Sequence, residues 1–78
     1  MKKVREWLKK LRKEKNLTQQ EVANSLEIVP SYYNMIENGE RQSKMTLDMA
    51  QKLSRVFGIS LEVVLQNEIL NIISKKES

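Results

Sequence analysis

The chain begins with apolar side chains repeated at helical spacing. A stripe at positions i, i+3, i+4 and i+7 is formed by Val4, Trp7, Leu8 and Leu11. Most of the residues between them are Lys, Arg or Glu, which is typical of an amphipathic surface helix. We therefore expect a first helix over residues 2–14. Asn16 is expected to end it, because asparagine tolerates the left-handed backbone conformation found after helices.

The next segment carries the start signal and the inner face of a second helix. Thr18 and Glu21 match a capping box. In this motif the threonine hydroxyl accepts a hydrogen bond from the N–H of residue 21, and the glutamate accepts one from the N–H of residue 18. Inward-facing apolar positions follow at Val22, Ala23 and Leu26. The helix is expected to end near Leu26 or Glu27.

Pro30 separates this helix from a third one. Proline lacks an N–H, favours an extended conformation at Val29 and suits the first position of a helix. A third helix is therefore expected from Pro30 to Asn38, with Gly39 supplying the backbone freedom for its end. Two short helices joined by a tight connection over residues 18–38 match the helix-turn-helix motif.

Two further helices are expected after a charged loop at residues 40–44. The fourth begins after Thr46, ends at Gly58 and carries its apolar face at Leu47, Met49, Ala50, Leu53, Val56 and Phe57. Ser60 caps the fifth, expected over residues 61–74 because apolar residues keep helical spacing to its end. The sequence thus predicts an all-α single domain of five helices over residues 1–74, with a tail at residues 75–78.

Composition narrows the classes of function. A chain of 78 residues is long enough for one small domain. It contains no Cys and no His, so disulfides, Cys-ligated metals and the commonest general base are excluded. We expect no catalytic site, no metal site and no cofactor. Its apolar runs are too short to span a bilayer, so we expect a cytoplasmic protein with no membrane partner.

Positive charge is concentrated at the N-terminus. The net charge is +4, yet the first fifteen residues hold only Glu6 and Glu14 against eight basic residues: Lys2, Lys3, Arg5, Lys9, Lys10, Arg12, Lys13 and Lys15. Such a segment suits a polyanion, but it is equally compatible with a solvated helix face. Charge alone does not decide between them.

Three segments in order carry a resemblance to a known family. They are LRKEKNLTQQEVANSL, PSYYNMIENGER and LSRVFGISLEVVL. Together they resemble the Cro/C1-type, or XRE-type, helix-turn-helix family of phage and bacterial repressors, from about Leu8 to Leu65. The resemblance implies a lambda-repressor-like fold of five helices that binds double-stranded DNA.

The same resemblance implies which residues contact DNA. Base edges would be contacted from the third helix by Pro30, Ser31, Tyr32 and Met35. Phosphates would be held by Gln19, Asn34, Asn38, Arg41, Gln42, Ser43 and Lys44, with Arg41 the strongest candidate. Alternatively, Gln19 is simply solvated and Tyr32 covers a neighbouring helix. None of the base-contacting residues is the bidentate Arg, Asn or Gln that would identify a base.

Other positions are implied to be structural. Arg12 and Glu37 occupy the places where the family commonly has an ion pair, while Tyr33 and Ile36 are expected in the core, with the Tyr33 hydroxyl at its rim. The chain departs from the family at Glu27, often glycine, and at Val29, usually Ser or Thr. The loop after Gly39 is also longer than common.

The last helix suggests a partner. Residues 66–74 are more apolar than an exposed helix should be, through Ile69, Leu70, Ile72 and Ile73, and Leu65 precedes them at helical spacing. We expect these residues to form a homodimer interface, unless the segment folds back on its own core. The leading hypothesis is a transcriptional regulator, of repressor or controller type, that binds an operator as a dimer. An antitoxin or protein-interaction module is the alternative, an enzyme is a distant third, and no small-molecule ligand is expected.

Overall fold

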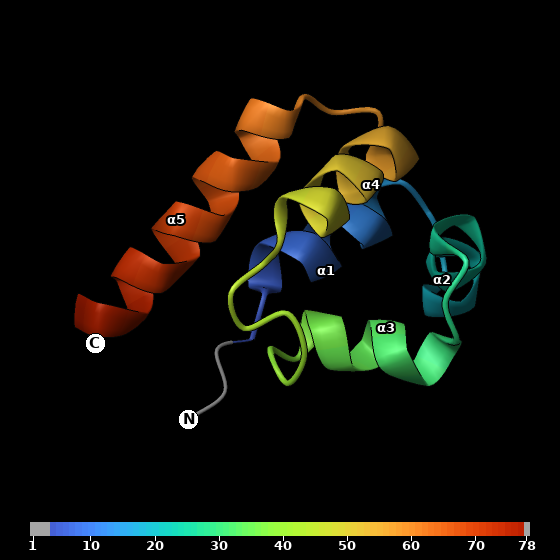
Figure 1. Ribbon diagram of the computed structural model, residues 1–78, viewed down its shortest axis with the longest axis horizontal. Coiled ribbons are helices and arrows are strands. Elements are labelled where there is room, and N and C mark those ends of the chain that lie inside the picture. Colours follow the sequence, from blue (N-terminus) through green and yellow to red (C-terminus); the bar gives the residue numbers. More distant parts are fainter. Residues whose placement is uncertain (1–3, 78) are drawn as a thin grey trace.

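The computed structural model describes residues 4–77, and the side chains of residues 4–73. Within these bounds there are five α-helices and no strand: α1 (Glu6–Glu14), α2 (Gln19–Leu26), α3 (Pro30–Glu37), α4 (Leu47–Phe57) and α5 (Leu61–Glu77) (Figure 1). The predicted all-α fold of five helices is confirmed. The molecule measures 34 × 25 × 23 Å, and the outer half of α5 extends away from the other helices (Figure 1).

The observed helix ends follow from local capping chemistry. The Thr18 hydroxyl accepts from the N–H of Glu21 at 3.0 Å, and the N–H of Thr18 donates to Oε1 of Glu21 at 2.8 Å. Both halves of the predicted capping box are therefore present. Asn16 and Gly58 adopt the expected left-handed conformation, with φ of 58° and 65°.

Two helix boundaries differ from the predicted ones. The first helix begins at Glu6 rather than at residue 2, because the N–H of Arg5 donates to the carbonyl of Glu37 at 2.7 Å and Arg5 has a non-helical backbone. Lys2 and Lys3 lie outside the described residues. At the other end α5 continues to Glu77, so residues 75–77 are helical rather than a tail. Ser78 lies outside the described residues.

One core joins the first four helices. Its buried apolar residues are Leu8, Val22, Ala23, Leu26, Tyr33, Ile36, Met49, Leu53 and Phe57. The inner face predicted for the second helix is thus confirmed. The Tyr33 hydroxyl does not reach the rim as expected: the residue is fully buried, and this hydroxyl makes no hydrogen bond of normal geometry to the described residues.

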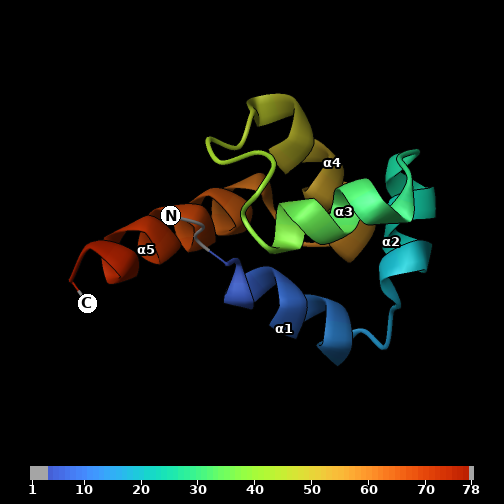
Figure 2. The same ribbon diagram turned by 90° about the horizontal axis from the view of Figure 1, so that it is seen from below.

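The fifth helix is anchored to this core by its first half. Val64 is fully buried and Glu68 is 8% exposed. In both ribbon views the second half then runs beyond the body of the domain (Figures 1 and 2). Within residues 4–77, no single helix is long and apolar enough to cross a membrane; Leu47–Phe57 and Leu61–Ile73 reach that length and composition only together, across a bend of 116°.

Candidate nucleic-acid interface

The helix α3 lies along one side of the molecule and presents a short polar face. It runs along the lower edge in Figure 1 and faces the viewer in Figure 2. Pro30, Ser31 and Asn34 are exposed, while Tyr32 and Met35 are half-buried. Tyr32 also packs against the core. Part of its side chain therefore has the alternative role considered for it, covering neighbouring helices. The predicted base-contacting residues thus share one helix, opposite its buried face.

An apolar side chain that sequence reasoning did not treat as a contact stands at the start of this helix. Val29 is the extended N-cap residue of α3 and is 62% exposed. It makes no side-chain capping bond, and Pro30 follows in the first helical position. The sequence indicated this position through its departure from Ser or Thr, and the exposed Val29 side chain places apolar surface close to Ser31 in the sequence.

A chain of hydrogen bonds ties the predicted phosphate-contacting residues to the buried ion pair. Arg12 Nε lies 2.6 Å from Oε2 of Glu37, forming the expected pair. Gln19 Nε2 donates to Oε1 of Glu37 at 3.0 Å. Asn34 then donates to Gln19 at 3.3 Å, and Asn38 donates to Asn34 at 3.1 Å. Gln19, Asn34 and Asn38 are therefore brought together on one surface, with their side chains held in place by neighbours.

The ion pair keeps its charges in this environment. Burial on its own raises the pKa of Glu37, but hydrogen bonds from Arg12 and Gln19, together with the nearby Tyr33 hydroxyl, outweigh it and lower the pKa below its ordinary value. Burial raises the pKa of Tyr33, and the nearby Glu37 carboxylate raises it further. At neutral pH Glu37 is therefore ionised and Tyr33 is a neutral phenol.

The loop after α3 presents cationic and polar side chains from a constrained backbone. Arg41, Ser43 and Lys44 are exposed, and Gln42 is half-buried. The N–H groups of Glu40 and Arg41 both donate to the carbonyl of Met35, at 2.8 and 3.2 Å. The Gln42 side-chain oxygen accepts from the N–H of Thr46 at 3.0 Å, so this oxygen is committed to the loop. Arg41, Ser43 and Lys44 are the side chains best placed to meet an anion.

Arg5 is the main residue that sequence reasoning missed. It was grouped with the basic N-terminal segment, yet it is 2% exposed. Its guanidinium makes an ion pair with Glu68 of α5, with Nε 2.6 Å from Oε1. The signal was present on both sides: Arg5 lies three residues before the inward-facing Leu8, and Glu68 follows the inward-facing Val64 by four.

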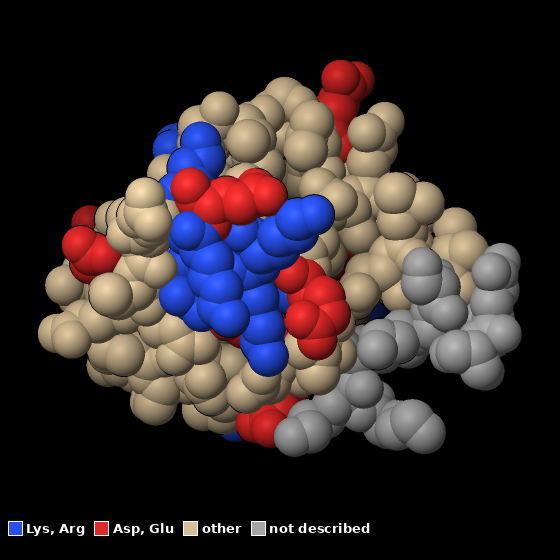
Figure 3. Space-filling model, turned by 180° about the vertical axis from the view of Figure 1, so that it is seen from behind, with Lys and Arg blue, Asp and Glu red and all other residues tan. Residues whose placement is uncertain are grey.

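Three further basic residues of the N-terminal segment, Lys9, Lys10 and Lys13, lie on an outer face of α1. Figure 3 views the molecule from behind, the side on which α1 lies, and shows Lys and Arg side chains interspersed with acidic ones. Lys9, Lys10 and Lys13 border a shallow hollow there together with Glu6 and Glu14. Arg5 and Arg12 are used in internal ion pairs. This arrangement favours a solvated helix face over a dedicated surface for a polyanion.

The outer half of α5 exposes large apolar side chains. Ile69, Leu70, Ile72 and Ile73 are 56%, 60%, 40% and 45% exposed, and Leu65 is half-buried. These four residues are therefore not buried by folding back on the core, which was the alternative to a dimer interface. Beside the helix, a groove of about 320 Å³ is bordered by Met45, Leu65 and Ile69 among others. The predicted interface residues thus all lie on α5, and together they are referred to below as the α5 face.

Comparison with known proteins places most of the chain in a family. Residues 8–64 match the sequence profile of the family described as "Helix-turn-helix". The chain is also similar to a protein named "Uncharacterized HTH-type transcriptional regulator YqaF" from Bacillus subtilis (strain 168). The two are 39% identical over 64 residues, which cover 82% of each. No solved structure gives a significant match.

Proposed function

Because the chain belongs to the helix-turn-helix family, in its Cro/C1-type (XRE-type) branch, we propose that it is a transcriptional regulator that binds an operator in double-stranded DNA through α3. Members of this family are DNA-binding regulators rather than enzymes. The observation that carries the proposal is the joint placement of three features. The polar face of α3 is exposed, Gln19 and Asn34 border it on one side, and the loop with Arg41 and Lys44 follows at its end.

Base contacts come from the first turns of α3. Ser31 donates or accepts at several base edges, and the Tyr32 hydroxyl adds a further polar group. Val29, Pro30 and Met35 supply apolar surface, which suits the methyl group of thymine in the major groove. Recognition by α3 therefore combines a few hydrogen bonds with apolar contacts, rather than the bidentate pairing typical of Arg with guanine.

Phosphate contacts fix the position of α3 in the groove. Gln19 lies in the first turn of α2, where backbone N–H groups also favour an anion. Asn34 and Asn38 extend the same polar surface, and Arg41 and Lys44 add positive charge in the following loop, next to Gln42 and Ser43. Contacts of this kind set affinity and register, while sequence choice belongs to α3.

The α5 face completes the proposal as the surface of a homodimer. A single α3 of eight residues is about 12 Å long and reaches one stretch of major groove. Two copies related by a two-fold axis would place their α3 helices on half-sites about one helical turn apart. Burial of the exposed Ile69 and Leu70 in that contact would remove apolar surface from water.

Selection of bound sequences from a random pool of duplex DNA tests the proposal directly. The expected outcome is enrichment of a palindromic sequence whose half-sites are about 10 base pairs apart, centre to centre. Its affinity should exceed that for random duplex by roughly 10³-fold or more. Recovery of no preferred sequence, with binding as weak as that to random DNA, would argue against a regulator.

A second candidate, a protein-interaction module of antitoxin type, rests on the same α5 face. Here the exposed Ile69 and Leu70 would contact a different protein rather than a second copy. Light scattering at micromolar concentration separates the two. The mass of two chains supports the homodimer, whereas the mass of one chain combined with weak DNA binding favours the second candidate.

A further inference from the structure

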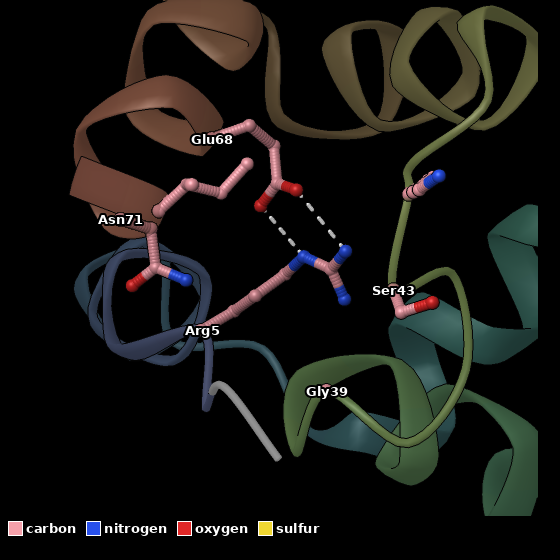
Figure 4. Close-up of a pocket in the computed structure, with 7 residues that line it drawn as sticks. Arg5, Gly39, Ser43, Glu68 and Asn71 are labelled. Atoms are coloured by element: carbon pink, nitrogen blue, oxygen red, sulfur yellow. Dashed lines mark hydrogen bonds and ion pairs between the residues drawn. The ribbon is translucent and has the colours of Figure 1, made fainter. Parts of the chain in front are cut away.

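We propose that Arg5 is a positioning residue for DNA binding, which holds the loop of residues 40–44 in its phosphate-contacting conformation and is itself held by Glu68 of α5. The proposal rests on the proposed function and deepens it. It assigns a role to the one deeply buried arginine of the described residues, and it connects the helix expected to dimerise with the loop expected to bind DNA. Figure 4 shows the guanidinium between α5 and that loop.

The contacts of Arg5 with the loop are all made to backbone carbonyls. Its Nη1 donates to the carbonyl of Ile36 at 2.7 Å and to that of Arg41 at 3.3 Å. Its Nη2 donates to the carbonyl of Gln42. One rigid guanidinium therefore fixes the end of α3 and two consecutive loop residues at once, which a flexible ammonium group is poorly suited to do.

The loop needs such support because its conformation is unfavourable in isolation. Gln42 has a left-handed backbone, with φ of 57°, which is unfavourable for a residue other than glycine. The neighbouring Gly39 is also left-handed, with φ of 79°. Arg5 supplies the contacts that select this conformation.

Glu68 in turn fixes the orientation of Arg5. Its two carboxylate oxygens accept from Nε at 2.6 Å and Nη2 at 3.1 Å, the fork geometry typical of paired Arg and carboxylate groups. Trp7 Nε1 donates to the same carboxylate at 3.1 Å, which limits its rotation. The positive charge buried at Arg5 is thereby balanced, and its remaining N–H groups are directed at the loop.

A groove borders one side of this link. A groove of about 350 Å³ lies beside the ion pair, with Ser43 and Lys44 on the loop side and Asn71 and Ile72 on α5 (Figure 4). The buried ion pair and its hydrogen bonds connect α5 with the loop beside this groove. A change in the position of Glu68 on α5 is therefore expected to reach the loop through Arg5.

The variant Glu68→Gln tests this link while keeping the shape of the side chain. The amide still accepts one hydrogen bond from Arg5 but loses the charge and the fork. We expect DNA affinity to fall roughly 2- to 30-fold, the range found for couplings through contiguous contacts. The fall should be equal for the selected operator and for random duplex, and the slope of log affinity against log salt should decrease by about one. Arg5→Lys should act in the same direction.

A double-mutant comparison separates positioning from a general loss of structure. In a protein carrying Arg41→Ala and Lys44→Ala, the loop has lost its cationic side chains but keeps the carbonyls that Arg5 binds. Glu68→Gln should then have no further effect on DNA affinity. Val64→Ala is the matched control, since Val64 is buried on the same helix. It should lower the melting temperature yet leave DNA affinity unchanged well below that temperature.

The other possible results overturn either this inference or the proposed function. If the wild-type chain binds DNA and Glu68→Gln binds equally well, the inference is overturned while the proposed function stands. The same holds if Glu68→Gln keeps its full effect in the Arg41→Ala, Lys44→Ala background, because the effect then arises through dimerisation or folding. If the wild-type chain binds no DNA, the proposed function fails first.

Discussion

Glu37 shows how a single residue combines stability with the placement of the DNA-binding surface. Its carboxylate is fully buried, accepts from Arg12 and Gln19, and lies near the Tyr33 hydroxyl. Removal of one partner of a buried ion pair costs about 3–5 kcal/mol, a large part of the stability of a small domain. Glu37→Ala is therefore expected to unfold the domain rather than to weaken DNA binding selectively. A cooperative melt at an unchanged temperature would contradict this.

The pH dependence of stability gives a finer test of the same residue. Because the pKa of Glu37 is lower in the folded chain than in the unfolded one, its contribution is fully present above about pH 5 and is lost as the pH falls through the folded pKa. Urea denaturation between neutral pH and pH 3 should show this loss in the wild type. Glu37→Gln should be less stable at pH 7 but lose less stability on acidification. Parallel curves for the two proteins would refute the assignment.

At the scale of single residues, sequence reasoning succeeds for local chemistry and fails for distant contacts. The capping box depends on residues three apart, and the left-handed Asn16 depends on its own side chain. By contrast, Arg5 and Glu68 are 63 positions apart, and their pairing exists only once α5 has packed across α1. The buried hydroxyl of Tyr33 was likewise unpredictable, since the depth of the core at that point depends on how four helices meet.

The end of helix α2 carries a strained residue where a glycine would fit. Glu27 is its C-cap residue, with a left-handed φ of 62°, and its side chain is exposed. Glu27→Gly should raise the free energy of unfolding by about 0.5–1 kcal/mol, because relief of the left-handed strain exceeds the entropy that glycine adds to the unfolded chain. Thermal or urea denaturation measures this gain.

Asn16 provides the matched control for that helix end. It follows α1 with a φ of 58°, but asparagine tolerates this conformation without help. Asn16→Gly should therefore change stability less than Glu27→Gly does. Equal gains at both positions would mean that the side chain at 27 is not the source of strain. The sequence indicated this difference, since the family resemblance implies that position 27 is often glycine.

The helix α3 and the loop after it should respond differently to substitution. Ser31→Ala or Tyr32→Ala should reduce the preference for the operator over random duplex by about 1–3 kcal/mol per lost base contact. Arg41→Ala should weaken binding to both DNAs alike and lower the salt slope by about one. Titrations of both DNAs at several salt concentrations measure the two effects. Equal losses on operator and random DNA for the Ser31 and Tyr32 variants would refute base contact by α3.

A single chain is too small to contact a long operator by itself. The length of DNA that it recognises therefore depends on its oligomeric state. One chain measures 34 Å along its longest axis and offers a single exposed α3. The α5 face lies on a helix that extends beyond the body of the domain (Figure 1). Through Glu68 and Arg5 the same helix is connected to the loop expected to hold phosphates. A second copy bound to the outer half of α5, beyond Glu68, would therefore double the contact with DNA while leaving the link through Arg5 in place.

Leu70→Lys tests this arrangement. Leu70 is 60% exposed, so the charge should not disturb the core, but it would lie within the proposed interface. In light scattering we expect two chains for the wild type and one for the variant. Affinity for a palindromic operator should fall roughly 10²-fold or more, because the second half-site is no longer bound by a linked copy. Affinity for an isolated half-site should stay within about twofold of the wild type, since its contacts are unchanged.

Gln51→Lys supplies the control for added charge. Gln51 is exposed on α4, so this variant carries the same additional positive charge away from the α5 face. It should remain dimeric and bind the palindrome at least as tightly as the wild type. If Leu70→Lys also stayed dimeric, the contact between copies would have to be made elsewhere. The exposed apolar residues of α5 would then be free for the different protein partner of the second candidate function.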